Sequence, residues 1–297
     1  MDFATFLQHL ANAIALGGMY ALLAVGYNMV YGILRLTNFA HGDIFMMAAY
    51  IAFYSWLVLG LPWWLSFPLT MILAAILGAA IERVAYRPLR DAPKISSMIA
   101  AIGASFFLEN FAFVVFGGRP KAFQRPEFLD RVYVVGGASV HSLTFVSIIA
   151  AVGFLLLMSY IIYKTKPGLA MRALAQNFEV ARLMGINVGT VISMAFMLGS
   201  ALAAAGSIMW SMKYPQILPL MGVMPGLKSF IGAVLGGIGS IPGAVLGAFV
   251  LGLGEIMLVA FLPGLTGYRD VFSFSILIIV LLFKPRGLLQ GKEVPKV

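Results

Sequence analysis

Cysteine is absent from the 297-residue chain, and charged side chains make up only 10% of it. Without cysteine there are no disulfide bonds, no thiolate catalysis and no cysteine-ligated metal sites. The scarcity of charge comes with a hydrophobic fraction of 61% and a mean hydropathy of +0.98. This composition is typical of a polytopic membrane protein. Because no soluble block is long enough to fold alone, we expect one membrane domain over residues 1–297.

Several signatures of catalysis and cofactor binding are also missing from the sequence. No GxxxxGK[ST] segment is present to hold ATP, and neither HExxH nor GxSxG occurs. The three histidines are scattered along the chain. We therefore predict neither an enzyme nor a cofactor bound by this chain. The net charge of +9 does not indicate nucleic acid, because the basic residues lie at the ends of apolar segments and form no continuous soluble face.

Long apolar runs dominate what is present. A helix needs about 20 residues to cross a bilayer, and eight runs approach this length. They lie near residues 10–34, 44–61, 64–82, 95–117, 142–163, 189–212, 243–262 and 267–283. The pattern predicts an all-α integral membrane protein, a polytopic bundle of about eight transmembrane segments.

Basic residues between the runs orient the chain in the membrane. They concentrate in 82–94, in 164–186 and in the tail after Phe283, which the positive-inside rule places in the cytoplasm. The four tryptophans, Trp56, Trp63, Trp64 and Trp210, then fall near the opposite face. Residues 118–141 form the predicted outer loop, although its four basic residues depart from the rule.

The count of crossings requires a broken segment near the C-terminal end. Between the inner loop at 164–186 and the inner tail, residues 213–262 must enter the membrane and return. A break is predicted in GGIGSIPGA, residues 236–244, where glycine and proline interrupt a helix. The hinge candidates are Gly236, Gly237, Gly239 and Pro242. A broken helix indicates a solute path, whereas Gly232/Gly236 and Gly243/Gly247 also have the spacing of close helix packing.

A second break, RLTNFAHGD, occupies residues 35–43. It carries Asn38, His41 and Asp43, which either belong to a solvated inner loop or line a path. If this break is re-entrant, the N-terminus lies inside, and otherwise it lies outside. Glu109 and Glu255 lie within apolar runs. An ionisable residue there is either a functional candidate or a structural group that is protonated or hydrogen-bonded to a neighbouring helix. The candidate path residues are Asn38, His41, Asp43 and Glu109.

The stretch 168–187 is amphipathic. Its apolar residues, Met171, Leu174, Ala175, Phe178 and Ala181, recur at helical spacing, away from the polar residues Arg172, Gln176, Glu179 and Arg182. Asn177 is a suitable cap for a second short helix, and Gly185 is suited to a left-handed end. Two short helices on the inner face fit either a lipid surface or the groove of a partner.

The segment EVARLMG, Glu179 to Gly185, resembles the EAAxxxG motif of ABC importer permeases. Glu179, Ala181 and Gly185 match, and Val180 replaces the middle alanine. Three longer stretches are similar to LivH-type permeases of branched-chain amino acid ABC importers. They are GGMYALLAVGYNMVYGILRLTNFAHGDIFMMAAY, KPGLAMRALAQNFEVARLMGINV and FIGAVLGGIGSIPGAVLGAFVLG.

The resemblance implies a multi-pass permease of the bacterial cytoplasmic (inner) membrane. Its partners would be a second permease subunit, two cytoplasmic ATPase subunits that use ATP, and an extracytoplasmic substrate-binding protein. The loop at about 164–188 would dock an ATPase, with Arg172, Glu179, Ala181 and Gly185 as coupling residues. Two alternatives remain at this point: an ion-coupled secondary transporter or channel, and an ABC permease for urea or amides.

Overall fold

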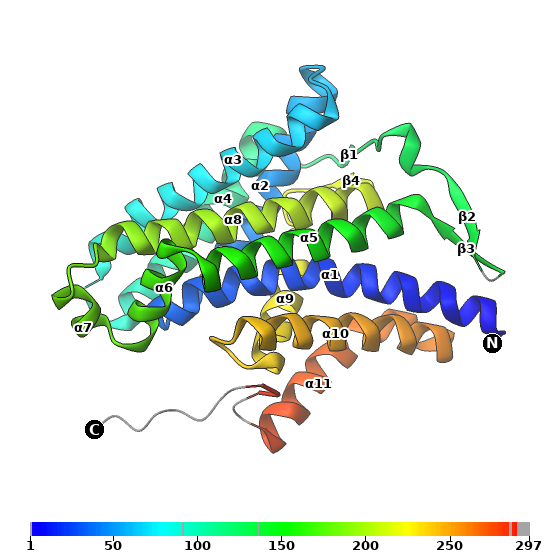
Figure 1. The fold of residues 1–297 in the computed structure, drawn as a ribbon. Helices are drawn as coiled ribbons and strands as arrows, with labels where there is room; N and C mark the ends of the chain where they lie inside the picture. Colours follow the sequence, from blue (N-terminus) through cyan, green and yellow to red (C-terminus); the bar gives the residue numbers. More distant parts are fainter. Residues whose placement is uncertain (1, 91, 136, 285–286, 290–297) are drawn as a thin grey trace.

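The computed structural model describes residues 2–90, 92–135, 137–284 and 287–289, and nearly all of its elements are helices (Figure 1). The α-helices are α1 Phe3–Leu34, α2 His41–Phe53, α3 Trp63–Ile81, α4 Lys94–Phe116, α5 Ser142–Lys164, α6 Lys166–Gln176, α7 Phe178–Leu183, α8 Val188–Lys213, α9 Val223–Gly236, α10 Ile241–Phe261 and α11 Arg269–Phe283. Two π-helical turns, η1 Tyr54–Val58 and η2 Glu82–Tyr86, and three 3-10 turns, η3 Arg87–Leu89, η4 Glu127–Leu129 and η5 Pro263–Tyr268, join them.

Four short strands lie outside the helices. They are β1 Lys121–Ala122, β2 Val132–Val135, β3 Ala138–His141 and β4 Gln216–Ile217. The pairs β1–β4 and β2–β3 are both antiparallel. The β1–β4 pair joins the segment 118–141 to the connection that leads into α9.

Seven helices in the described part of the chain are long and apolar enough to cross a membrane, which confirms the predicted helical bundle. The predicted span at 44–61 is not among them, so the count differs from the expected eight. Here α2 ends after 13 residues and continues as the π-helical turn η1. At this turn the Ser55 hydroxyl donates a hydrogen bond to the Ala52 carbonyl oxygen at 3.2 Å and shares another with the Ser66 hydroxyl at 2.5 Å. A hydropathy pattern does not reveal such contacts.

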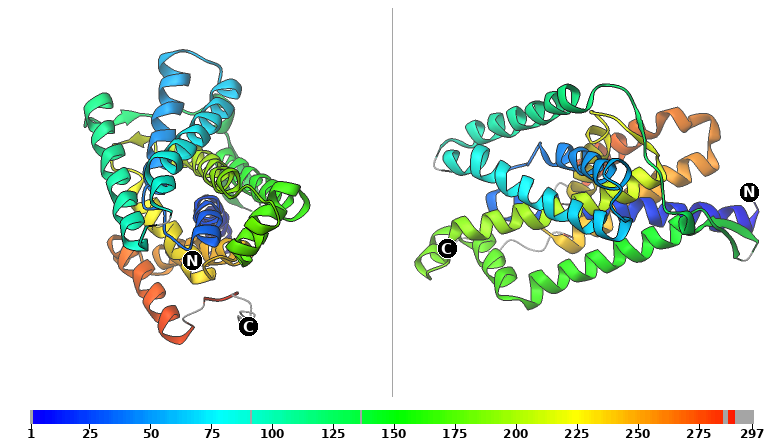
Figure 2. Two further views of the ribbon diagram at one scale, coloured as in Figure 1. Left: turned by 90° about the vertical axis from the view of Figure 1, so that its left-hand side faces the viewer. Right: turned by 90° about the horizontal axis from the view of Figure 1, so that it is seen from above.

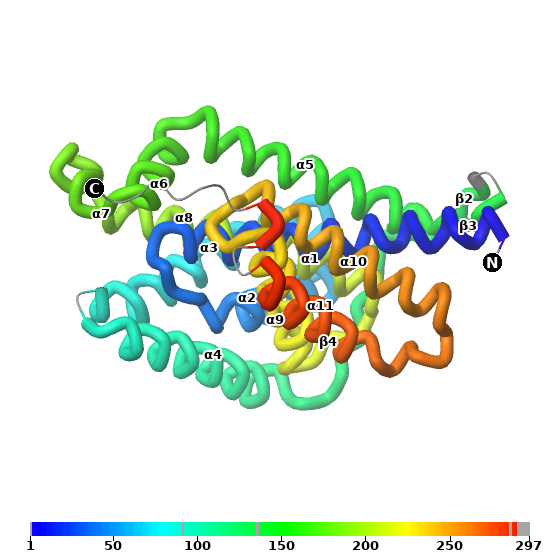
Figure 3. The backbone as a smooth tube through the Cα atoms, turned by 90° about the horizontal axis from the view of Figure 1, so that it is seen from below, coloured from blue at the N-terminus to red at the C-terminus, as the bar shows by residue number. Residues whose placement is uncertain are grey.

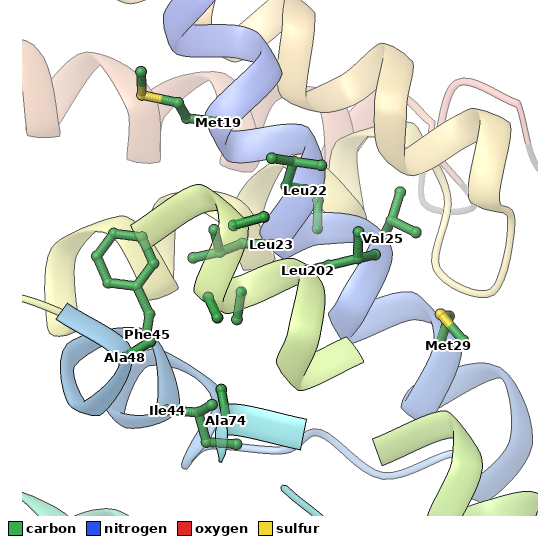
Figure 4. Close-up of a cluster of buried hydrophobic side chains, with 14 of the residues drawn as sticks. Met19, Leu22, Leu23, Val25, Met29, Ile44, Phe45, Ala48, Ala74 and Leu202 are labelled. Atoms are coloured by element: carbon green, nitrogen blue, oxygen red, sulfur yellow. The ribbon is translucent and has the colours of Figure 1, made fainter. Parts of the chain in front are cut away.

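The centre of the bundle is α1. In its most apolar stretch 94% of the residues are buried, whereas in the corresponding stretch of α4 only 17% are buried. Seen end-on, α1 is surrounded by the other helices (Figure 2). It packs against α5, α8, α9 and α10, and Figure 4 shows Leu22, Leu23 and Val25 of α1 beside Leu202 of α8. Glycine permits the closest approach: a Cβ on Gly252 of α10 would lie 2.6 Å from the Gly17 Cα.

The basic connections meet at one end of the bundle. Arg90 and Phe178 line the same cavity, and the Ser193 hydroxyl donates to Glu82 at 2.6 Å. Residues 82–94 and 164–188 therefore share an end, as the charge pattern predicts. The tail was predicted to join them, but Arg286, Lys292 and Lys296 lie outside the described residues. Within the part that is described, the Leu288 and Leu289 N–H groups donate to the carbonyl oxygens of Leu235 and Gly236.

Aromatic residues gather at the other end. The rings of Trp56 and Trp63 lie 5.6 Å and 5.3 Å, centroid to centroid, from Phe123 and Phe128 of the segment 118–141. The N-terminal part of α1 packs beside β3 at this same end (Figure 1). Of the two possible positions for the N-terminus, the structure thus favours the side of the predicted outer loop.

The chain enters and returns between 213 and 262, as the crossing count requires. Helix α9 has only 14 residues, and the turn at 237–240 leads into α10. Helix α9 packs against α1, α2, α10 and α11 near the middle of the molecule (Figure 3). The start of α9 is thereby placed beside the start of α2.

Candidate translocation site

A cavity of about 190 Å³ lies between α1, α2, α4 and α9. Asp43 and Glu109, both predicted as path residues, line it together with Ser105. The other lining residues are Tyr27, Phe39, Gly42, Ile102, Phe106, Gly222, Val223, Gly226 and Leu227. The cavity therefore combines two carboxyl groups with a largely apolar wall.

Asp43 sits in the first turn of α2, where the helix dipole favours a negative charge. Its side chain is only 4% exposed, and the Ser105 hydroxyl of α4 donates to its Oδ2 at 2.5 Å. Glu109 follows Ser105 by one helical turn on α4, which brings both onto one face. Of the two alternatives for Asn38, His41 and Asp43, the solvated inner loop is excluded, because all three residues are buried within the bundle.

Glycine shapes the floor of the cavity, where the starts of α2 and α9 touch. A Cβ on Gly222 would lie 1.9 Å from the Gly42 carbonyl oxygen, and one on Gly42 would lie 2.7 Å from the Gly222 carbonyl oxygen. Both distances are far below a normal contact, so a side chain at either position forces the helices apart. The separation of α2 and α9 thus depends on these two glycines.

Tyr27 of α1 is a lining residue that the sequence analysis missed. It is 7% exposed, and its hydroxyl makes no hydrogen bond within the described residues. The hydroxyl oxygen lies 3.5 Å from the position that a Cβ on Gly226 would take. The rings of His41 and Phe230 hold the phenol at centroid distances of 4.5 Å and 5.9 Å. One tyrosine in a long apolar helix gives no sequence signal of such a position.

Asn38 and His41 do not line this cavity. The Asn38 Oδ1 accepts a hydrogen bond from the Tyr86 hydroxyl at 3.1 Å, and His41 packs behind Tyr27. Both are buried, at 2% and 1% exposure. The structure therefore brings Asp43 and Glu109 together and leaves Asn38 and His41 as neighbours of the cavity wall.

Glu255 belongs to a separate buried cluster. Its Oε1 lies 2.9 Å from the Lys228 Nζ of α9, and it accepts hydrogen bonds from the hydroxyls of Tyr20 and Ser273 at 3.2 Å and 2.6 Å. Lys228 also pairs with Asp270 of α11 at 2.8 Å. This cluster ties α1, α9, α10 and α11 together. Glu255 is hydrogen-bonded to neighbouring helices, as its structural alternative expects, and it also forms an ion pair that the sequence did not indicate.

The predicted hinge lies at the junction of α9 and α10. Helix α9 ends at Gly236, and Gly237 and Gly239 have φ angles of 112° and 91°, a region that glycine adopts readily. Pro242 occupies the first turn of α10. The Asn28 side chain of α1 holds the turn, because it donates to the Ser240 carbonyl oxygen at 2.9 Å and accepts from the Gly239 N–H at 3.1 Å.

Close helix packing accompanies this break. A Cβ on Gly236 would lie 1.7 Å from the Gly243 carbonyl oxygen, and a Cβ on Gly247 would lie 2.1 Å from the Gly232 carbonyl oxygen. The alternative of small-residue packing therefore holds at the same residues as the break.

The predicted coupling residues lie on α6 and α7, at the basic end of the bundle. Asn177 caps α7 by accepting from the N–H groups of Glu179 and Val180, and Gly185 ends this element with a φ of 80°. Ala181 is buried, whereas Glu179 is exposed. The Arg172 guanidinium lies 5.5 Å from the centre of the Tyr163 ring.

One known protein family matches nearly the whole chain. Residues 9–281 match the family model described as branched-chain amino acid transport system / permease component. The chain belongs to this permease family. Its members are membrane permease subunits and not enzymes, and they work with other transporter subunits. Together with the apolar helices, membership identifies a multi-pass protein of the bacterial cytoplasmic membrane.

Two relatives of this permease cover nearly its whole length, and a third covers less than half of it. It is 40% identical to the high-affinity branched-chain amino acid transport system permease protein LivH of Salmonella typhimurium, over 100% of this chain and 99% of that protein. It is 40% identical to BraD of Pseudomonas aeruginosa, a permease of the same description, over 98% of each. The autoinducer 2 import system permease protein LsrC of Shigella flexneri is 29% identical over 46% of this chain and 43% of its own.

A solved structure shares the fold of the permease. PsaBC from Streptococcus pneumoniae in complex with Fab aligns with a TM-score of 0.50 at 13% identity, over 96% of this chain and 94% of that chain. At this identity the likeness concerns the arrangement of helices alone.

Proposed function

We propose that this permease carries branched-chain amino acids across the cytoplasmic membrane as one subunit of an ABC importer. The observation that supports this most is the 40% identity, along the whole chain, to permeases named for that transport. The proposed partners are a second permease subunit, two cytoplasmic ATPase subunits that consume ATP, and an extracytoplasmic substrate-binding protein. In this proposal the chain itself binds no cofactor.

The contact with an ATPase is assigned to α6 and α7. Beyond the bundle, α7 exposes an apolar tip in which Val180, Leu183 and Met184 are 52%, 86% and 79% exposed. An apolar tip among basic residues favours a partner groove as its cover. In the proposal Ala181 anchors α7 to the body, Glu179 and Arg172 supply polar contacts, and Gly185 sets the turn that presents the tip.

The path is assigned to the cavity that Asp43 and Glu109 share. Asn38 and His41 would support its wall from behind, and the break from Gly236 to Pro242 would be the hinge at which α9 and α10 rearrange. An ion-coupled carrier is the competing function, because buried carboxyl groups suit ion coupling. Such a carrier has no use for the exposed tip of α7.

Two matched glycine variants test the coupling. Gly185 and Gly60 both have positive φ angles, 80° and 68°, and neither has a neighbour within 4 Å of an added Cβ. Gly60 follows η1, near the tryptophan end of the bundle. Gly185→Glu and Gly60→Glu therefore impose similar backbone strain, of about 1–2 kcal/mol, and only Gly185→Glu alters the proposed ATPase contact.

The assay is uptake of radiolabelled leucine, isoleucine, valine and urea into cells that express the complete importer, with copurification of the ATPase. We expect the wild-type importer to take up the three amino acids but not urea. Gly185→Glu should abolish both amino acid uptake and copurification of the ATPase, whereas Gly60→Glu should retain both. Urea uptake without leucine uptake would refute the substrate assignment. Normal copurification and uptake with Gly185→Glu would refute the coupling assignment.

A further inference from the structure

Among the described residues, no cation balances the carboxyl groups in the cavity between α1, α2, α4 and α9. None of the described residues that line the cavity is basic. The nearest lysine along the chain, Lys228, adjoins the lining residue Leu227, but its Nζ is engaged by Glu255 and Asp270 at 2.9 Å and 2.8 Å. Asp43 and Glu109 therefore face a shared space without a positive partner. Burying the Asp43 carboxylate without a compensating charge is costly, and a cationic ligand offsets that cost.

Tyr27 supplies an independent indication of a ligand. Its side chain is more than nine-tenths buried, lines the cavity and has no hydrogen-bond partner within the described residues. A phenol both donates and accepts hydrogen bonds, so its hydroxyl is available to a ligand in the cavity. Because His41 and Phe230 hold the ring, the free hydroxyl has a fixed position at the cavity.

The size and walls of the cavity limit the ligand to a small molecule with an apolar part. A cavity of about 150 Å³ accommodates benzene, and the cavity here is about 190 Å³. Ile102, Phe106 and Leu227 provide an aliphatic and aromatic wall opposite the carboxyl groups. A short branched side chain fits such a wall, while a primary ammonium group fits the carboxylates.

We propose that this cavity binds the ammonium group of the transported amino acid between Asp43 and Glu109, with the Tyr27 hydroxyl as a third contact. The inference rests on the proposed import function for the identity of the amino acid. It adds a criterion of selection: a substrate must carry a positive charge to enter. Neutral amides and urea lack this charge, so the carboxyl groups favour an amino acid over these solutes.

The test is equilibrium binding to the purified permease–ATPase complex in lipid nanodiscs, without ATP and without the substrate-binding protein, so that leucine bound by that partner is not counted. Radiolabelled leucine is competed with 3-methylbutylamine, which keeps the ammonium group, and with 4-methylpentanoate, which lacks it. We expect competition by the amine and none by the carboxylic acid. Equal competition by 4-methylpentanoate, or no leucine binding at millimolar concentration, would overturn the proposal.

Variants assign the binding to this cavity. Asp43→Asn and Glu109→Gln remove charge and keep shape, and an asparagine at 43 still accepts the Ser105 hydrogen bond. We expect Kd for leucine to rise about tenfold or more in each, and severalfold in Tyr27→Phe, which removes only the hydroxyl. Glu127→Gln, an exposed carboxyl group in the segment 118–141, is the matched control and leaves Kd unchanged. Wild-type Kd in both Asp43→Asn and Glu109→Gln would overturn the assignment.

A chemical readout separates an amino acid from an inorganic cation. Hydrophobic carbodiimides modify carboxyl groups in apolar surroundings, and leucine should slow the modification of Asp43 and Glu109. Protection by sodium alone, with none by leucine, would overturn the proposal. Normal leucine uptake by the assembled importer combined with unchanged binding in the variants would leave the proposed function standing and reject only this site.

Discussion

The ion pair between Lys228 and Glu255 gives the sharpest prediction for stability. Lys228→Met removes the only cation that forms an ion pair with Glu255 within the described residues. Glu255 is 2% exposed, and after the change it retains only the hydroxyls of Tyr20 and Ser273. Breaking a buried pair by removing one partner typically costs about 3–5 kcal/mol, because an uncompensated charge remains. We expect a loss of that size in the free energy of unfolding.

The second pair of the cluster provides the comparison. The Asp270 side chain is 47% exposed, and an exposed ion pair contributes only about 0–1 kcal/mol. Asp270→Asn should therefore cost far less than Lys228→Met. In the double variant Lys228→Met/Glu255→Gln no buried charge is left unpaired, so a large part of the lost stability should return.

The assay is unfolding of the purified permease in mixed micelles by increasing mole fractions of SDS, followed by circular dichroism and tryptophan fluorescence. The wild type, the two single variants Lys228→Met and Glu255→Gln, and the double variant form a double-mutant cycle, and Asp270→Asn is its control. A cost below about 1 kcal/mol for Lys228→Met would refute the reasoning. So would an equal cost for Asp270→Asn, because burial would then not decide the strength of the pair.

Three further predictions follow from the packing and from the ends of the bundle. Asn28→Ala removes both hydrogen bonds that hold the α9–α10 turn and should cost about 1–3 kcal/mol in the same SDS titration; no measurable loss would contradict this. Gly222→Ala, which meets the Gly42 carbonyl oxygen, should weaken leucine binding, whereas Gly103→Ala, which has open space, should not; equal Kd values would contradict the packing. Because the natural chain has no cysteine, a membrane-impermeant maleimide should label Glu127→Cys but not Ala92→Cys in intact cells, and labelling of Ala92→Cys would reverse the assigned orientation.

Features that depend on single residues and local backbone were accessible from the sequence. The break at 236–244 follows from glycine and proline, whose backbone preferences act without tertiary contacts. The cap by Asn177 and the turn at Gly185 are similarly local. The shared end of 82–94 and 164–188 follows from charge, since basic loops gather on one side of the membrane.

Features that depend on how helices rotate against one another were not accessible. Asn38, His41 and Asp43 lie within six residues, yet only Asp43 lines the cavity. Lys228 meets Glu255 on another helix, and nothing in either local sequence names the partner. Tyr27 enters the cavity because of the packing of α1 against α2 and α9. The direction in which each of these side chains faces is set by the packing of the assembled helices, and neither hydropathy nor periodicity predicts it.

The enclosure of α1 has a consequence for how the protein is made. α1 leaves the ribosome before its neighbours α8, α9 and α10, which lie between residues 188 and 261. At roughly 5–20 residues per second, the segment that satisfies Asn28 is synthesised on the order of ten seconds or more after α1 enters the membrane. During that interval Asn28 and Tyr20 lack the Ser240 and Glu255 acceptors that they have in the finished protein. A nascent chain that ends before α10 thus leaves these two polar side chains of α1 without the partners that the finished protein provides.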